Sequence, residues 1–163
     1  MKTKPFLLPI CSVLFLLFVS CTADDNLSID EGDLRGVWEL AEFKVFDDAT
    51  NTALPNAEFI LSELLAIDCK ILQYNFRADG TLITESTIHY IHTDPEIIAC
   101  PSGVSTTFTG SWELNGSKLT LGDDASGSSD TIDILLAKNT LKIAGEELDP
   151  ETLAGSEFVL RRR

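Results

Sequence analysis

The sequence is poor in basic residues and in the residue types that most often carry out chemistry. Its 163 residues include 12 Lys and Arg against 26 Asp and Glu, for a net charge of −14. Such a surface repels nucleic acid and anionic polymers, so we expect no nucleic-acid partner. Only two His and four Cys are present. No G-x-S-x-G, phosphate-loop, H-E-x-x-H or dinucleotide-binding motif occurs, so we predict neither an enzyme nor a bound cofactor.

A hydrophobic stretch long enough to cross a membrane is also missing. The one extended apolar run, Phe6 to Val19, has 14 residues and contains Pro9, whereas a membrane span needs roughly 18–20 residues. It follows Lys2 and Lys4, and a basic start before a short apolar run is typical of a signal peptide. We therefore predict a cleaved signal peptide at residues 1–20. Its removal leaves 10 basic against 26 acidic residues, a net charge of −16.

The end of this segment carries the first resemblance. Leu17-Phe18-Val19-Ser20-Cys21 resembles the lipobox of bacterial lipoproteins, in which the cysteine receives a diacylglycerol. It departs from the usual pattern in having Phe18 where Leu is common. The resemblance implies that acyl chains on Cys21 hold the protein to the outer membrane of a Gram-negative bacterium, on its periplasmic or cell-surface face. The alternative is a secreted protein that is cut elsewhere and keeps Cys21 as a free thiol.

A short polar segment separates this cysteine from the rest of the chain. Residues 21–33 are predicted to form a flexible acidic tether. Asp24-Asp25 resembles a surface-export signal of some lipoproteins, and an ordinary solvated linker explains the same residues equally well. No repeat or second linker follows, so residues 34–163 are predicted to form one domain, and we expect a monomer.

Two cysteines remain for this domain. Cys11 leaves with the signal peptide and Cys21 is predicted to be acylated, which leaves Cys69 and Cys100. An even pair in an exported protein favours a disulfide. Two buried free thiols are the alternative.

The domain is dominated by alternation of apolar and polar residues, which is typical of strands with one buried face. In the clearest case Val104, Phe108 and Trp112 share one face, while Thr107 and Thr109 share the other. The predicted strands are 35–46, 69–77, 81–92, 104–114, 117–122, 131–137, 141–145 and 156–162. In 35–46 the apolar set slips by one residue, which indicates a β-bulge.

Short turn signals join several of these strands. Ala78-Asp79-Gly80, Asn115-Gly116 and Lys138-Asn139 predict tight connections, so strands that follow one another in sequence should pair. We therefore predict an all-β fold, an up-and-down antiparallel barrel of about eight strands. Residues 57–67 instead have helical spacing, with Asn56 as N-cap. This short helix between strands 1 and 2 would cap one open end of the barrel.

Several motifs, taken in order, resemble the lipocalin-like domains of Gram-negative lipoproteins. Gly36-Val37-Trp38 resembles the G-x-W of the first lipocalin strand. Tyr74-x-Phe76-x-Ala78-Asp79-Gly80-Thr81 and Thr109-Gly110-Ser111-Trp112 resemble later parts of that group, and Cys69 and Cys100 lie where such domains often carry a cysteine pair. The resemblance implies a barrel base in which Arg161 or Arg162, with Arg161 as our choice, lies over Trp38. A plain core aromatic is the alternative for Trp38.

The predicted inward face also supplies candidate ligand contacts. These are the apolar and aromatic residues of three strands, namely Leu72, Tyr74, Phe76, Ile88, Tyr90, Phe108 and Trp112. They favour a pocket for a small hydrophobic or amphipathic molecule. A side-chain-filled core is the alternative, and the protein would then act through its loops on a protein or glycan.

Three polar groups are weaker candidates. His89, His92 and Asp94 are close in sequence, but on a strand the two histidines would face opposite sides, so we predict no metal site. Residues 123–130 suggest a calcium loop but lack the Gly and Glu that an EF-hand requires, so a solvated turn is predicted. A Ser–His–acid set assembled from distant positions stays open as the enzymatic alternative.

Overall fold

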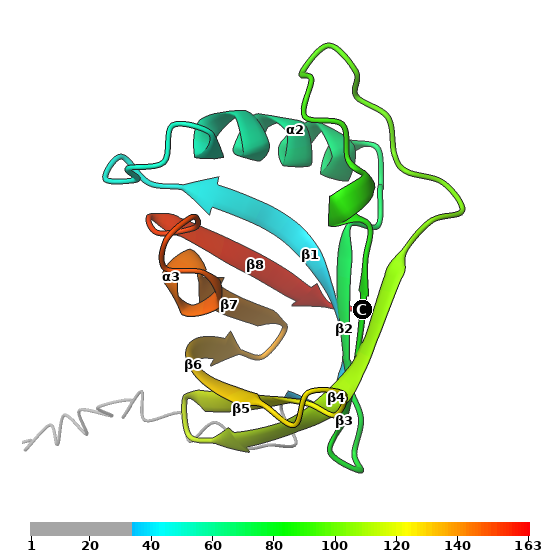
Figure 1. Ribbon diagram of the computed structural model, residues 1–163, viewed down its shortest axis with the longest axis vertical. Coiled ribbons are helices and arrows are strands. Elements are labelled where there is room, and N and C mark those ends of the chain that lie inside the picture. Colours follow the sequence, from blue (N-terminus) through cyan, green and yellow to red (C-terminus); the bar gives the residue numbers. More distant parts are fainter. Residues whose placement is uncertain (1–33) are drawn as a thin grey trace, which may run out of the picture.

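The computed structural model describes residues 34–163, where eight antiparallel strands close into a barrel (Figure 1). Each strand pairs with its neighbours in sequence, and the last strand returns to the first. The predicted all-β, up-and-down architecture is thus confirmed. The signal peptide at 1–20, the acylation of Cys21 and the tether at 21–33 lie outside the described residues and stay predictions.

The elements follow the order expected of a meander. They are β1 (Gly36–Val45), α2 (Leu54–Ala66), β2 (Leu72–Phe76), β3 (Thr81–Ser86), the 3-10 helix η1 (Ile88–Tyr90), β4 (Thr106–Asn115), β5 (Lys118–Asp123), β6 (Ser129–Ala137), β7 (Thr140–Ala144), α3 (Gly145–Leu148) and β8 (Ser156–Arg162).

The two ends of the barrel differ in their connections. At one end, which we call the base, tight turns join β2 to β3, β4 to β5 and β6 to β7. Gly80 and Gly116 occupy these turns with φ of 82° and 62°, a conformation that glycine adopts without strain. At the opposite end, the mouth, the chain runs through long connections that contain α2, η1 and α3. The turn residues predicted from sequence therefore define the base.

The predicted bulge lies in β1. Its pairing with β8 shifts between Leu40 and Glu42, so that Leu40 and Phe43 both face the interior and are about 95% buried. Without the extra residue, the alternation of β1 would send one of these side chains outward.

Helix α2 begins earlier than predicted. It starts at Leu54 after Ala53, with Pro55 in the first turn and no side-chain cap. Proline fits the first turn because the missing N–H has no helical acceptor there. Asn56 is therefore not the N-cap; its Nδ2 donates instead to the Thr93 carbonyl at 3.2 Å. In Figure 1 the helix lies alongside β1 at the mouth, and β1 provides its main contacts with the barrel. No helix in residues 34–163 is long and apolar enough to cross a membrane.

The predicted strand 81–92 is too long, because β3 ends at Ser86. Its partner β2 starts only at Leu72, which pairs with Ser86, so residues beyond Ser86 have no strand to pair with on that side. The Ser86 hydroxyl accepts a hydrogen bond from the Ile88 N–H at 3.3 Å, and the chain turns into η1. Ile88 and Tyr90 are consequently 40% and 45% exposed and do not belong to the barrel wall.

Candidate functional site

The base of the barrel is closed by a tryptophan with two polar contacts. Trp38 has no exposed surface, and its Nε1 donates to the Leu34 carbonyl at 2.7 Å. Arg162 pairs with Trp38 across the β1–β8 ladder and places its guanidinium carbon 4.6 Å from the centre of the indole. A guanidinium over an aromatic face stabilises by about 0.5–2 kcal/mol.

Arg162, and not Arg161, is thus the base arginine. Arg161 pairs with Glu39 and is exposed, since adjacent strand residues face opposite sides. Gly36 has φ of 119°, and a Cβ at this position would lie 3.4 Å from Nη1 of Arg162. The same Nη1 donates to the Arg35 carbonyl at 2.6 Å. Gly36 therefore leaves room for the arginine that covers Trp38.

Buried side chains fill the half of the barrel next to the base. Phe76 and Trp112 are 2% and 8% exposed and meet edge to face, with ring centres 5.4 Å apart. Trp112 Nε1 donates to the Arg77 carbonyl at 3.0 Å. Further residues here have no exposed surface, namely Leu119, Leu141 and Leu160. Of the predicted ligand contacts, Phe76 and Trp112 are therefore part of the packed core.

A second layer lies closer to the mouth. Tyr74 pairs with Thr84, and Thr84 with Phe108, so all three share the inward face with Phe76, Leu82 and Trp112. Phe108 nevertheless keeps 38% of its surface exposed. An inward-facing aromatic with that exposure can be reached by a small molecule from the mouth. Tyr74 and Phe108 were predicted from the sequence as ligand contacts, but Thr84 was not, although its spacing from buried Leu82 places it on this face.

The Tyr74 hydroxyl has no hydrogen-bond partner among residues 34–163. Burial raises the pKa of this hydroxyl above its usual value, so it stays neutral and can donate or accept a hydrogen bond. No side-chain polar atom that is fully buried in this part of the chain lacks a partner. The Tyr74 hydroxyl must therefore keep some contact with solvent, and it is available to a ligand.

A pocket of about 400 Å³ lies at the mouth ends of β2 and β3. Leu72 and Ser86 contribute from the inward face of the hairpin, while Gln73 and Glu85 contribute from its outward face. The wall is completed by the ends of neighbouring connections, namely Asp68, Lys70, Thr87, Cys100, Pro101 and Ser105. Its volume falls within the range of small-molecule sites. Of the predicted contacts, only Leu72 lines it.

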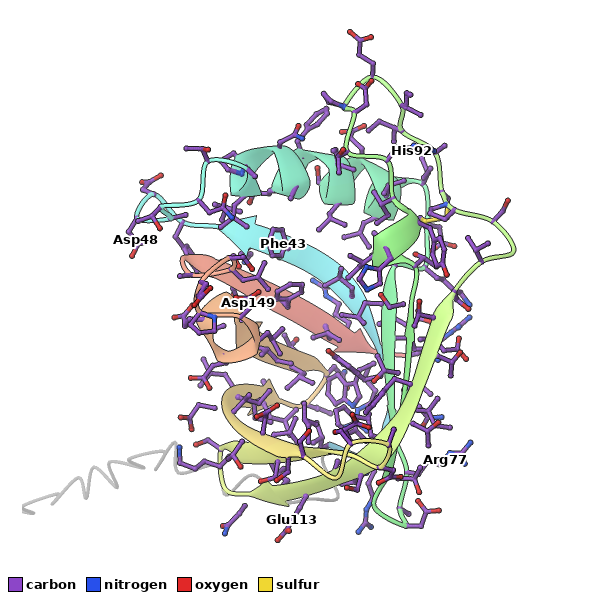
Figure 2. All side chains as sticks on the ribbon, in the orientation of Figure 1. Phe43, Asp48, Arg77, His92, Glu113 and Asp149 are labelled. Carbon is purple, nitrogen blue, oxygen red and sulfur yellow. A yellow bond between two sulfur atoms is a disulfide. The ribbon has the colours of Figure 1, made fainter. Side chains whose placement is uncertain are left out.

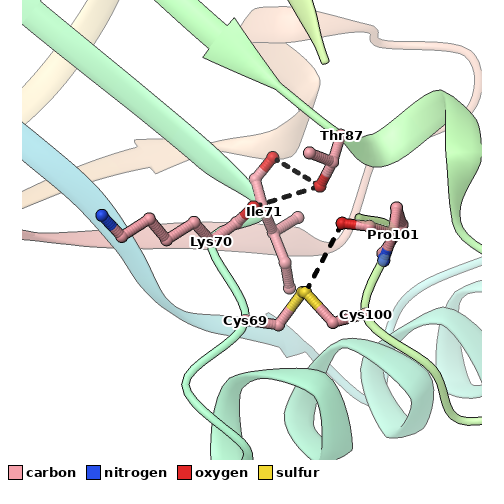
Figure 3. Close-up of a disulfide and its surroundings, with 6 residues drawn as sticks. All are labelled: Cys69, Lys70, Ile71, Thr87, Cys100 and Pro101. Atoms are coloured by element: carbon pink, nitrogen blue, oxygen red, sulfur yellow. Dashed lines mark hydrogen bonds between the residues drawn. A yellow bond between two sulfur atoms is a disulfide. The ribbon is translucent and has the colours of Figure 1, made fainter. Parts of the chain in front are cut away.

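The predicted disulfide between Cys69 and Cys100 is present at this pocket (Figure 3). It ties the segment after α2 to the 87–105 connection. Next to it, the Thr87 hydroxyl donates to the carbonyls of Lys70 and Ile71 at 3.1 and 3.4 Å. These links hold one wall of the mouth in place.

The weaker polar candidates do not assemble into sites. In the described residues, no group of three or more His, Cys, Asp or Glu is placed to hold a metal ion. His89 lies in η1, and His92 lies in the loop above α2 (Figure 2). Between β5 and β6, Asp123 accepts hydrogen bonds from the Ser126 hydroxyl at 2.7 Å and the Ala125 N–H at 2.8 Å. The Ser126 hydroxyl is the main cause of the lowered pKa of Asp123. This carboxylate thus stabilises a turn.

No family model and no curated protein matches the chain. Among solved structures, the chain is similar to a lipocalin-like protein from Bacteroides uniformis, with 17% identity over 81% of this chain and 100% of that one and a TM-score of 0.46. It is also similar to an uncharacterized protein from Bacteroides eggerthii, with 12% identity over 79% of this chain and 98% of that one and a TM-score of 0.44. The closed barrel and its strand order are established by the pairing described above. The strand pairing itself shows a closed, eight-stranded antiparallel β-barrel.

Proposed function

We propose that the protein is a membrane-anchored lipoprotein whose barrel binds a small hydrophobic or amphipathic molecule through its mouth. The observation that carries the proposal is the layer formed by Tyr74, Thr84 and Phe108. It faces inward, yet Phe108 is 38% exposed and the Tyr74 hydroxyl has no hydrogen-bond partner among residues 34–163.

The chemistry of the layer supports an amphipathic ligand. Phe108 offers apolar surface, while Tyr74 and Thr84 offer hydroxyls for one polar group of the ligand. The packed base half, with Phe76 and Trp112, limits the ligand to the mouth half. We therefore expect a molecule of modest size.

Native mass spectrometry of the mature protein from its own host tests binding. We expect a ligand adduct that weakens strongly in Tyr74→Phe, because only the hydroxyl is removed. Tyr90→Phe is the matched control, since Tyr90 lies outside the barrel wall, and it should retain the adduct. The binding proposal is wrong if no adduct is found, or if both variants lose it equally.

The anchor needs a separate experiment. Cys21→Ser should abolish labelling by a radioactive fatty acid and release the protein from the membrane fraction. Cys11→Ser, inside the predicted signal peptide, is the matched control and should leave labelling and fractionation unchanged. Normal membrane retention of Cys21→Ser would contradict the lipoprotein assignment.

The filled base favours a second candidate, an interaction or structural lipoprotein that contacts a protein or glycan through its loops. The predicted contact is the long loop Thr93 to Gly103 at the mouth, in which residues 93–97 are all exposed. Cross-linking in the host and pull-down should then recover a partner, which a variant lacking the exposed residues 93–97 loses. Recovery of the same partner by that variant would count against this candidate.

A further inference from the structure

Large exposed hydrophobic side chains gather at one end of the molecule. All but one of those in the described residues lie on elements of the mouth; the exception is Leu135, on the side wall in β6 and 67% exposed. The base turns instead carry Asp79, Asn115 and Lys138. Six of the mouth side chains lie on α2, just after it, or in the 87–105 connection, and we call this set the α2–loop patch: Phe59, Ile67, Ile88, Tyr90, Ile97 and Val104.

The patch belongs to two segments that are fastened together. The disulfide Cys69–Cys100 joins the end of α2 to the 87–105 connection, and Asn56 donates to the Thr93 carbonyl from the start of the helix. Ile91 and Ile98 of the same connection pack against the core. The patch is therefore presented by a supported surface.

The length of chain before the barrel indicates what can cover the patch. Twelve residues, 22–33, separate Cys21 from Leu34 at the base, and when extended they span about 40 Å. β1 has 10 residues, equivalent to about 33 Å of strand. A bilayer that holds Cys21 is therefore within reach of the mouth, a step that rests on the lipoprotein proposed above.

Charge restricts the kind of bilayer. Neither α2 nor the 87–105 connection contains Lys or Arg, and Glu63, Asp94 and Glu96 are exposed on them. Anionic headgroups would be repelled, whereas zwitterionic ones would accept exposed aromatic and branched side chains at the interface.

We propose that the α2–loop patch docks on a zwitterionic phospholipid surface, so that the mouth opens toward the bilayer and the ligand is exchanged with it. The bilayer would cover apolar surface that the barrel leaves exposed, and it would present amphipathic molecules next to the Tyr74–Phe108 layer.

Vesicle flotation of the unacylated mature chain, with Cys21→Ser, tests docking without the anchor. Wild-type patch residues should give binding to phosphatidylcholine vesicles and weaker binding to vesicles rich in phosphatidylglycerol. In the triple variant Phe59→Gln, Ile67→Gln and Ile97→Gln, the partition coefficient into phosphatidylcholine vesicles should fall by about tenfold or more. Leu135→Gln, an exposed residue away from the patch, is the control and should bind like the parent.

The outcomes separate the two proposals. Equal binding of the triple variant and its parent, or no binding to either kind of vesicle, overturns docking. Neither result bears on the lipid anchor, which fatty-acid labelling at Cys21 tests separately. Concentration-dependent dimers that the triple variant abolishes, seen by sedimentation without vesicle binding, would identify a second copy as the occupant and also overturn it. Loss of labelling in the host, with vesicle binding retained, would instead contradict only the anchor.

Discussion

The base and the mouth of this barrel are built from the same alternating strands but differ in how completely their side chains pack. At the base, short turns and a stack of Arg162 on Trp38 leave the interior without exposed apolar surface. At the mouth, long connections surround an inward-facing Phe108 that keeps more than a third of its surface exposed. Packing at the base stabilises the fold, and incomplete packing at the mouth leaves a place for a ligand. The packed base and the proposed binding layer are thus separated along the barrel axis.

The largest expected effect comes from emptying the base. Trp38→Ala should lower the free energy of unfolding by about 3–5 kcal/mol, because it leaves a large cavity. Phe108→Ala should cost about 1 kcal/mol or less, since the side chain is already partly solvated. Denaturant unfolding under oxidising conditions measures both. Equal losses would show that base and mouth do not differ in packing.

The disulfide is expected to stabilise the mouth nearly as much. Cys69 and Cys100 are 31 residues apart, and the double variant Cys69→Ala, Cys100→Ala should lose about 3–4 kcal/mol on the chain-entropy model. Amide hydrogen exchange should become faster in residues 87–105 than the loss of global stability alone explains. At the turn Asn115-Gly116, exchange should change by no more than that global loss. Faster exchange confined to the base would be the opposite of this expectation.

Substitutions of the two neighbouring arginines test which of them covers Trp38 at the base. Arg162→Met should lower stability by about 0.5–2 kcal/mol, because the guanidinium over Trp38 is lost, and it should shift the fluorescence of that indole. Arg161→Met should change stability by less than about 0.5 kcal/mol. Thermal unfolding and tryptophan emission provide the readouts. A larger loss of stability in Arg161→Met would indicate that Arg161, and not Arg162, covers Trp38.

The smallest effect is expected from acid. The pKa of Asp149 is lowered mainly by the Thr152 hydroxyl, which donates to it at 2.5 Å. The pKa of Asp79 is lowered mainly by the Thr81 N–H. A lowered folded-state pKa means that stability is present above the ordinary carboxyl pKa and is lost as pH falls through the folded-state value. Asp79 is exposed and Asp149 is only half-buried, so solvent screens both carboxylates and the loss should be small.

Urea unfolding between about pH 5 and pH 2 checks this prediction. Asp149→Asn should flatten the acid side of the stability curve, because the substituted amide does not titrate. An unchanged slope would show that Asp149 does not contribute to the loss of stability in acid.

The parts of the fold that could be predicted from sequence depend on local chemistry. Asn115-Gly116 predicted a hairpin because both positions accept positive φ, and the alternation around Trp112 predicted a half-buried strand. The slip of the apolar pattern in β1 likewise predicted its bulge. In these cases a few neighbouring residues determine the conformation.

The predictions that were wrong concern features that depend on pairing with residues distant in sequence. Alternation continued through Ile88 and Tyr90, but β3 ends where β2 stops providing a partner. The choice between Arg161 and Arg162 required the register with Trp38, and a shift of one residue reverses every face. For the candidate site, sequence placed Phe108 inward, but its exposure depends on how far the surrounding connections cover it.

The most direct test is titration of the mature protein with N-phenyl-1-naphthylamine, a neutral apolar fluorophore, in the parent and in Phe108→Gln and Leu135→Gln. If a small apolar molecule enters at the mouth, the parent and Leu135→Gln should bind the fluorophore with similar affinity, and Phe108→Gln should bind it about tenfold more weakly. Equal affinity in all three proteins, or no binding by the parent, would contradict the account.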